Sequence, residues 1–176
     1  GSDVRRLSHH ETNEWHPSVS NDGRILYTRW DYVDRHTNIA HSVWSTNTDG
    51  TDPVAVFGNY NRDHKPWGEW HPQPIPGSHK LLAIAGAHHG YAYGSLLLLD
   101  PLRGGDGQAS LTRLTPDVPF PEAEGWPNHA FTTPLALSEK YYLVSYSPDW
   151  STRNASHKVT QGIYLVDVFG NRELIY

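Results

Sequence analysis

Short stretches in which apolar and polar residues alternate dominate this chain, and clusters of turn residues separate them. One such stretch, Arg24-Ile-Leu-Tyr-Thr28, follows the turn sequence Asn21-Asp22-Gly23. Alternation bounded by Gly, Asn and Asp is typical of half-buried β-strands. The run Leu96–Leu99 is apolar at every position, which indicates a strand covered on both faces. No stretch keeps the apolar period of about 3.6 residues that marks a helix, so the pattern predicts an all-β protein.

The strand pattern repeats along the chain. The tetrapeptide Glu-Trp-His-Pro occurs at positions 14–17 and again 55 positions later, at 69–72. Each copy is followed by an extended piece, a turn and an alternating strand. A third unit without the tetrapeptide begins near Pro134, 62 positions after Pro72. Repetition at a nearly fixed period indicates stacked structural units. We expect the tetrapeptide to end the loop that leads into the first strand of each unit.

Each unit also contains a second pair of strands. Asp49-Gly50, Gly104-Gly105 and Gly170-Asn171 supply hairpin turns within these pairs. Repeated units of four antiparallel strands predict a β-propeller segment of about three blades. The alternative is an ordinary β-sandwich. The expected pairs are 42–46 with 53–57, 95–99 with 111–114, and 162–167 with 172–176.

The predicted division assigns the whole chain, residues 1–176, to one propeller segment. Residues 1–10 are an outer strand of a preceding blade with its loop, and the three blades span 11–58, 59–117 and 118–176.

Several phrases allow a family resemblance to be named. The segments from Pro17 to Thr28 and from Trp44 to Thr51 resemble the TolB-type (PD40-like) propeller repeat. More narrowly, four longer phrases resemble the propeller region of the hydrazine synthase alpha subunit and its uncharacterised bacterial relatives. The likeness covers nearly the whole chain, and these phrases are Leu26–Arg35, Pro74–Lys80, Pro134–Tyr146 and Gly162–Tyr176.

The resemblance implies that three blades are half of a six-bladed propeller. It also implies that the chain is a segment of a larger exported bacterial protein, in the periplasm or outside the cell. The haem chemistry of hydrazine synthase needs Cys-x-x-Cys-His attachment sites, and this chain has no cysteine. We therefore carry none of that activity over. Gly1-Ser2 and the absence of Met indicate that the chain was cut from a longer protein.

Composition excludes several classes of function. With no cysteine, the chain has no disulfide, thiolate metal site or covalently attached haem. The formal net charge is −5, and no cluster of Lys and Arg has the density of a nucleic-acid binding surface. No apolar run approaches the ~20 residues of a membrane span, so we expect no membrane insertion. The chain also lacks the motifs of nucleotide-binding loops and of common hydrolases.

The long connections of the three blades are predicted to share one face. In a propeller blade, the loops between blades and those between the second and third strands lie at the same end. Eleven of the twelve histidines fall there by this assignment, and His79 alone falls on the side of the short turns. Long loops on a rigid scaffold often carry function. This loop face is the candidate site.

Histidines on the loop face suggest a metal site. Neutral imidazoles bind zinc and copper, and we name His71, His88 and His89 as candidate ligands, with His16 as a further one. The alternative is a pair of hydrogen-bonded loop histidines at 88 and 89, because neighbours in an extended chain point to opposite sides. No other cofactor is expected.

Aromatic and charged residues on the same face suggest a ligand surface. Trp67, Trp126 and Trp150 do not follow the repeat, so they are better ligand candidates than Trp15 and Trp70, which we expect to wedge between blades. Four further candidates accompany them: Tyr91, Tyr93, Asp31 and Arg35. An acidic loop around Asp31 could hold Ca²⁺ or serve as acid and base, and the alternative is an Asp–Arg pair that stiffens the loop.

The sequence predicts a non-catalytic binding, interaction or scaffold module that contacts its ligand through the loop face. One alternative is a metal-binding protein or metal-dependent enzyme, and another is a carbohydrate-binding module. The expected partners are the rest of a multidomain parent protein, another propeller segment or a second copy that closes the ring, and a glycan. Nothing in the sequence identifies a catalytic residue.

Overall fold

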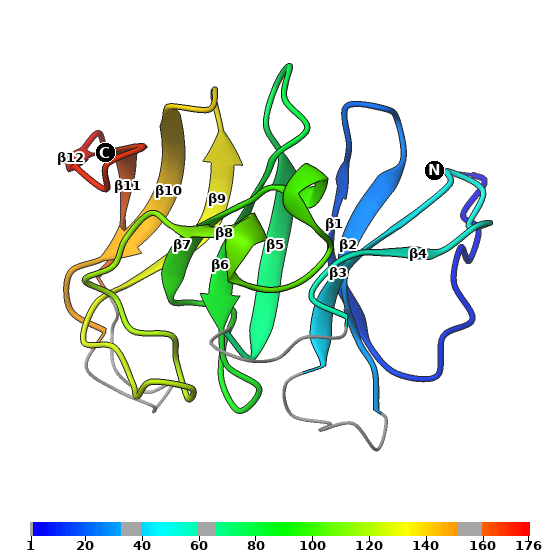
Figure 1. Cartoon of the computed structure of the whole chain (residues 1–176), viewed down its shortest axis with the longest axis horizontal. Helices are drawn as coiled ribbons and strands as arrows, with labels where there is room; N and C mark the ends of the chain where they lie inside the picture. The colour runs from blue at the N-terminus through cyan, green and yellow to red at the C-terminus, as the bar shows by residue number, and fades with distance from the viewer. Residues whose placement is uncertain (1, 33–39, 60–65, 151–159) are drawn as a thin grey trace.

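Twelve strands in three groups of four make up the structure, a computed structural model that describes residues 2–32, 40–59, 66–150 and 160–176 (Figure 1). The first group is β1 (Glu14–Val19), β2 (Ile25–Trp30), β3 (His41–Thr46) and β4 (Val54–Phe57). The second is β5 (Gly68–Pro74), β6 (Leu81–Gly86), β7 (Ser95–Leu99) and β8 (Leu111–Arg113). The third is β9 (Ala130–Ala136), β10 (Tyr141–Ser147), β11 (Gly162–Asp167) and β12 (Arg172–Leu174).

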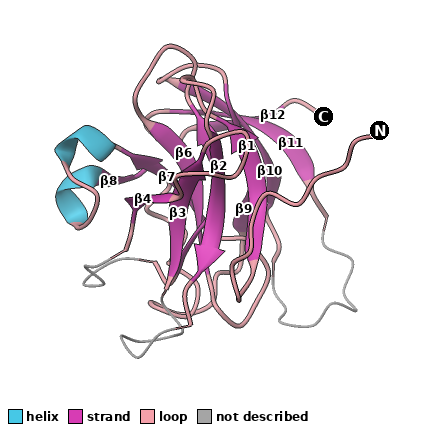
Figure 2. Cartoon of the chain, turned by 90° about the vertical axis from the view of Figure 1, so that its right-hand side faces the viewer, coloured by secondary structure: helices cyan, strands magenta, loops and turns pink. Residues whose placement is uncertain are grey.

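Within each group, every strand pairs antiparallel with the next one in the chain. We call the groups blades 1, 2 and 3; Figure 1 shows them side by side, with the termini at opposite ends. A single parallel pairing, His41 with Gly68, joins blades 1 and 2 into one sheet. Two short 3-10 helices, η2 (Pro101–Arg103) and η3 (Gln108–Ser110), lie beside β8 (Figure 2). The described residues confirm the predicted all-β, propeller-like class.

The repeated tetrapeptide lies inside the first strand of its blade, so its expected place at the end of a loop was wrong. In β1 the pairing jumps from Trp15 to Ser18, which leaves two residues opposite one, as in a β-bulge. The same jump occurs in β5 and, without the tetrapeptide, in β9. His16, His71 and Thr133 adopt φ of 54°, 52° and 46° at these bulges, each directly before a proline. The repeat therefore encodes a backbone shape.

Two apolar clusters fill the spaces between the blades. Leu82, Ile84 and Leu96 face blade 3 and pack with Phe131 and Tyr142. Their neighbours along β6 and β7 face blade 1 in the second cluster: Leu81, Ala83, Ala85, Leu97 and Leu99. Both faces of blade 2 are thus buried, as its continuous apolar runs predicted.

Hydrogen bonds also fix blade 1 against blade 2. The Ser18 hydroxyl donates to the carbonyl of Pro72 (2.6 Å), and the Thr28 hydroxyl donates to the carbonyl of Glu69 (2.7 Å). The Asn21 side-chain amide donates to the carbonyls of Ile75 and Ser78. These bonds tie β1, β2 and the turn between them to β5 and the turn that follows it, which positions the loop face described below.

Residues 2–10 form no strand, in contrast to the outer strand expected there. They lie against blade 1 instead: the Leu7 carbonyl oxygen is 2.1 Å from where a Cβ on Gly50 would stand. The His10 ring also contacts the Trp30 carbonyl at 3.0 Å. A strand needs a neighbouring edge, and the described residues provide no preceding sheet with which this segment could pair.

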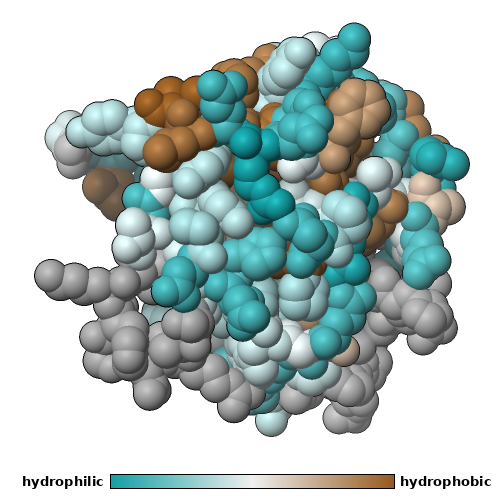
Figure 3. Space-filling view, turned by 90° about the vertical axis from the view of Figure 1, so that its left-hand side faces the viewer, coloured by the Kyte–Doolittle hydropathy of each residue, from teal (hydrophilic) through white to brown (hydrophobic). Residues whose placement is uncertain are grey.

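The outer face of blade 3 exposes apolar side chains, which Figure 3 shows as brown areas among polar ones. They include Leu135, Leu137, Ile163, Leu174 and Ile175, each 43–57% exposed. In the described part of the chain, no helix has the length and apolarity needed to cross a membrane.

Candidate functional site

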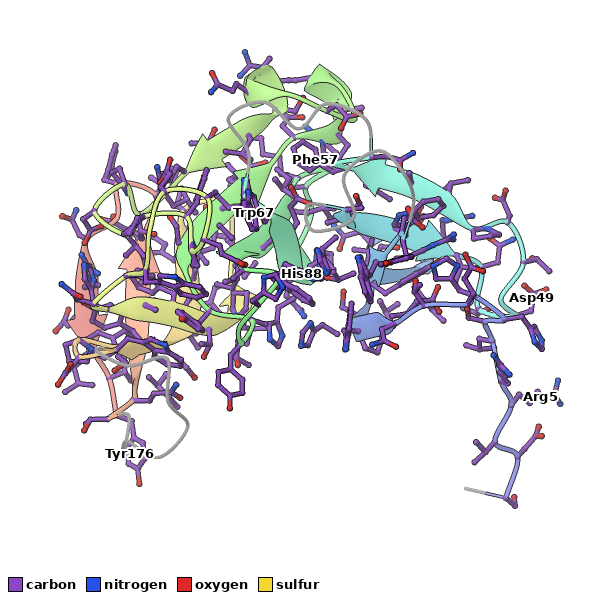
Figure 4. The ribbon with its side chains drawn as sticks, turned by 90° about the horizontal axis from the view of Figure 1, so that it is seen from below. Arg5, Asp49, Phe57, Trp67, His88 and Tyr176 are labelled. Atoms are coloured by element: carbon purple, nitrogen blue, oxygen red, sulfur yellow. The ribbon has the colours of Figure 1, made fainter. Side chains whose placement is uncertain are left out.

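The described connections between β6 and β7 and between β8 and β9 reach the lower end of the blades in Figure 1, and Figure 4 views the molecule from that end. Figure 4 shows His88 near the centre of this loop face, where blade 2 meets blade 1. The candidate ligand Arg35 and the neighbouring acidic residue Asp34 lie outside the described residues.

A pocket of about 340 Å³ opens on the loop face between blades 1 and 2. Its walls are aromatic and imidazole rings with few other polar groups. We call it the ring pocket, and it is lined by Asn13, Trp15, His16, Trp30, His41, Trp70, His88, Gly90, Tyr91 and Ala92. Its size falls at the lower end of the ~300–1,000 Å³ that is usual for small-molecule sites.

The rings of the pocket support one another. His41 is 2% exposed and stacks parallel to Trp30, with ring centroids 5.7 Å apart and planes at 5°. On its other side the His41 ring is 5.0 Å from Trp70. Trp70 lies flat on the backbone: a Cβ on Gly86 would be 2.2 Å from its Cδ1, and one on Gly68 would be 2.6 Å from its Nε1. Glycine at both positions is therefore required for the buried wall of the pocket.

A hydrogen-bond relay orients His88. Nδ1 of His41 lies 3.2 Å from the Trp67 carbonyl oxygen, which can only accept, so Nδ1 carries the proton. In the tautomer that donates through Nδ1, Nε2 of His41 accepts from Nδ1 of His88, 3.2 Å away. This network assigns the proton of His88 to Nδ1 and leaves Nε2 with a lone pair. Among the described residues, no protein group bonds that nitrogen.

The Glu122 carboxylate fixes the backbone beneath the two adjacent histidines. Its Oε2 accepts the amide N–H groups of both His88 and His89 at 2.8 Å, and its Oε1 contacts Nδ1 of His89 at 2.5 Å. Burial acts to raise the pKa of Glu122, but these hydrogen bonds outweigh it and lower the pKa. The pair at 88 and 89 thus forms a pinned loop, with His88 turned to the pocket and His89 to Glu122.

The two tetrapeptide histidines stack at the inner edge of the blades. The ring centroids of His16 and His71 are 3.5 Å apart, with planes at 29°. Burial, followed by the nearby His16, lowers the pKa of His71 to about 4. Burial likewise lowers the pKa of His16. Both rings are accordingly neutral at pH 7.

The candidate metal ligands separate into these two groups. His71 lies with His16, and His89 lies with Glu122 rather than with His71. Nowhere in the described ranges do three or more His, Asp or Glu side chains form a group suited to hold a metal ion.

The aromatic candidates have different surroundings. Tyr93 (3% exposed) and Trp150 (9%) pack on each other with centroids 4.5 Å apart, and Trp126 covers them. These largely covered rings have little surface left for a ligand. Tyr91 is 61% exposed at the edge of the ring pocket. Trp67 contributes its carbonyl to the relay.

Asp31 serves a buried ion pair. It is 5% exposed, and its Oδ1 accepts from Nε of Arg29 at 2.9 Å and lies 3.5 Å from Nε2 of His10. This pairing joins the end of β2 to the amino-terminal segment. The arrangement is structural, of the kind that the Asp–Arg alternative described, with Arg29 as the partner.

Comparison with known proteins gives the fold. The chain is similar in structure to hydrazine synthase of Kuenenia stuttgartiensis, with a TM-score of 0.69 and 18% sequence identity. The match covers 97% of this chain and 20% of that chain. This supports the resemblance at the level of a propeller-like fold, and at this identity it shows the fold alone. No protein-family model matches the chain, and no curated protein matches it.

Sequence reasoning missed the centre of the site. Trp30 ends β2 and His41 begins β3, so both were assigned to strands or their adjoining loop and neither was named as a candidate. Trp15 and Trp70 were expected only to wedge between blades, yet both also line the pocket. The useful signal was the position of Trp30 and His41 at the loop-face ends of paired strands, where they face each other directly in the β2–β3 ladder.

Proposed function

We propose that this chain is a non-catalytic binding segment of a larger propeller protein and that the ring pocket is its contact site. One observation carries the proposal: tryptophans and histidines from two blades converge on a pocket on the face that holds the long loops. A concave pocket that combines aromatic walls with a few placed polar groups is typical of ligand sites. The bulge holds His16 at φ 54°, which strains the local backbone. Such strain persists mainly where the surrounding structure enforces the conformation.

Screening by thermal denaturation tests this function. A library of several hundred small metabolites, both neutral and charged, is tested for compounds that raise the melting temperature of the full chain. The variant Trp30→Ala removes a pocket wall and should abolish the shift. Trp126→Ala changes a loop-face tryptophan outside the pocket and should retain it. Ligands that stabilise both variants equally, or no ligand for the intact chain, would refute the pocket as the contact site.

The proposal also includes the surroundings of the segment. The match to only 20% of a much longer chain supports a parent with further blades, which we place in a six-bladed ring of TolB-type repeats. The exposed outer face of blade 3 supports a covering partner there, either a further segment or a second copy. We also propose that the parent protein is exported and lies in the periplasm or outside the cell.

Metal binding is the second candidate. The lone pair on Nε2 of His88 favours it, because a neutral imidazole oriented through its other nitrogen is a common metal ligand. Elemental analysis of the purified chain after exposure to zinc and copper tests it. A stoichiometric metal that is lost in His88→Phe would replace the ligand-binding proposal.

A further inference from the structure

We propose that the ring pocket binds a neutral hydroxylated ring, a sugar, which stacks on the tryptophan walls and donates one hydroxyl hydrogen bond to Nε2 of His88. This inference rests on the proposed function and names its ligand class. Three independent properties of the pocket lead to it: the acceptor, the walls and the lack of charged side chains among the described lining residues.

The acceptor is fixed before any ligand arrives. The Trp67 carbonyl sets the proton on His41, and His41 sets the proton on His88, so Nε2 of His88 offers a lone pair. The hydrogen bond from Nδ1 to His41 holds the ring, whose centroid lies 5.2 Å from that of the Trp30 ring, and Glu122 holds the backbone amide. A lone pair held in this way requires a ligand with an O–H or N–H donor.

The walls suit a ring with C–H groups on its faces. Trp15 and Trp30 are half-buried and both line the pocket, so part of each ring remains accessible. The negative face of an indole attracts the positive hydrogens of an apolar ring face. Asn13 adds a side-chain amide, and Tyr91 adds a hydroxyl at the exposed edge. Such alternation of apolar faces and small polar groups matches a sugar, whose hydroxyls surround an apolar ring.

Among the residues that the structure describes, no Asp, Glu, Lys or Arg side chain lines the pocket. A charged ligand would lose water there without gaining an opposite charge, which is costly. Burial, followed by the neighbouring His89, lowers the pKa of His88, so it adds no charge at pH 7. Carboxylates, phosphates and amines are therefore disfavoured. A quaternary ammonium ion would suit the tryptophans through cation–π attraction, but it has no hydrogen to donate to His88.

Calorimetric titration of the full chain at pH 7.5 tests the inference. The probes are glucose, galactose and N-acetylglucosamine, the β1,4-linked trisaccharides of glucose and N-acetylglucosamine, and tetramethylammonium chloride. We expect at least one sugar to bind and tetramethylammonium not to bind. His88→Phe keeps a ring of similar size without the acceptor, and should weaken sugar binding about tenfold or more.

Two matched variants separate the hydrogen bond from general disruption. His79→Phe alters a histidine on the side of the short turns, which contacts Asp100 and does not line the ring pocket, and should change affinity less than about twofold. His88→Gln retains an accepting oxygen and should restore part of the affinity lost in His88→Phe. Near-ultraviolet circular dichroism establishes that each variant keeps the native packing of its tryptophans.

The outcomes are distinct. Sugar binding that weakens in His88→Phe and persists in His79→Phe supports the inference. It is overturned if no sugar binds at up to about 50 mM, if sugars bind His88→Phe as well as the unaltered chain, or if tetramethylammonium binds more tightly than every sugar. If the metabolite screen yields a pocket ligand of another class, the proposed function stands and the sugar assignment falls.

Discussion

The stacked pair of His16 and His71 makes the stability of this protein depend on pH. The structure holds His71 against a second imidazole at 3.5 Å and lowers its pKa from 6.5 to about 4. Protonation would bury a charge beside a ring that is itself only partly solvated. Replacing His71 with Gln, which cannot be protonated, should remove this dependence.

The size of the effect follows from the shift in pKa. Each unit corresponds to ~1.4 kcal/mol, so a change from 6.5 to about 4 has an upper limit of about 3 kcal/mol. The ring is only partly buried, and solvent screening reduces this to about 1–2 kcal/mol. Because the folded-state pKa is lowered, the unfolded chain binds a proton first as the pH falls. The contribution of neutral His71 is complete above pH 6.5 and is lost progressively between pH 6.5 and 4.

Urea denaturation followed by tryptophan fluorescence measures this contribution. The free energy of unfolding is determined at pH 7.5 and pH 4.5 for the unaltered chain and for His71→Gln. We expect the unaltered chain to lose about 1–2 kcal/mol more than the variant over this interval. Other groups titrate in both proteins, so only the difference between them reports on His71.

His9→Gln is the matched control, because His9 is an exposed histidine of the amino-terminal segment. It should follow the pH dependence of the unaltered chain. Equal losses of stability in the unaltered chain and in His71→Gln would refute the reasoning, since they would mean that the His71 ring is not desolvated by the stack.

Three further predictions concern the core, the loop and the outer face. Gly86→Ala places a methyl group 2.2 Å from Cδ1 of Trp70, so we expect thermal denaturation to show a loss of about 1–3 kcal/mol in the free energy of unfolding. The control Gly105→Ala, whose added methyl group has its nearest contact at 3.6 Å, should leave the stability nearly unchanged. Glu122→Ala removes the carboxylate that accepts two loop amides, and hydrogen exchange should show both amides exchanging faster; unchanged rates would contradict the pinned loop. Ile163→Glu places a charge on the exposed face of blade 3 and should reduce self-association at high concentration, as measured by light scattering; a strictly monomeric unaltered chain would argue against a second copy as the covering partner.

The strands could be predicted because their signals are local. Turn residues such as Asn21-Asp22-Gly23 separate the alternating runs, and the fully apolar run Leu96–Leu99 indicated burial on two faces, as found. The bulges could not be predicted in this way. A positive φ at a histidine is disfavoured by its own side chain, so no local preference indicates it. Only the repetition of the tetrapeptide indicated that these positions share a particular structure.

The site was predicted only as a face. The long connections predicted the end of the blades on which the ring pocket opens, but they did not indicate which rings form its walls. Trp30 and His41 lie opposite each other because β2 and β3 pair in one register, and this is a property of the sheet rather than of either segment. Tyr93 and Trp150 are covered because two distant segments pack together. Contacts between segments far apart in sequence determine both results.

The bulge in β9 keeps its shape without the Trp and His of the other two blades. Thr133 takes the same place and a similar φ of 46°, and Pro134 follows it as Pro17 and Pro72 follow the histidines. The backbone shape of this repeat therefore does not depend on a histidine at the bulge. Each blade presents one residue there that differs between blades while the surrounding hydrogen-bond ladder keeps its form. A substitution at this position changes the chemistry that a blade presents and leaves the bulge in place.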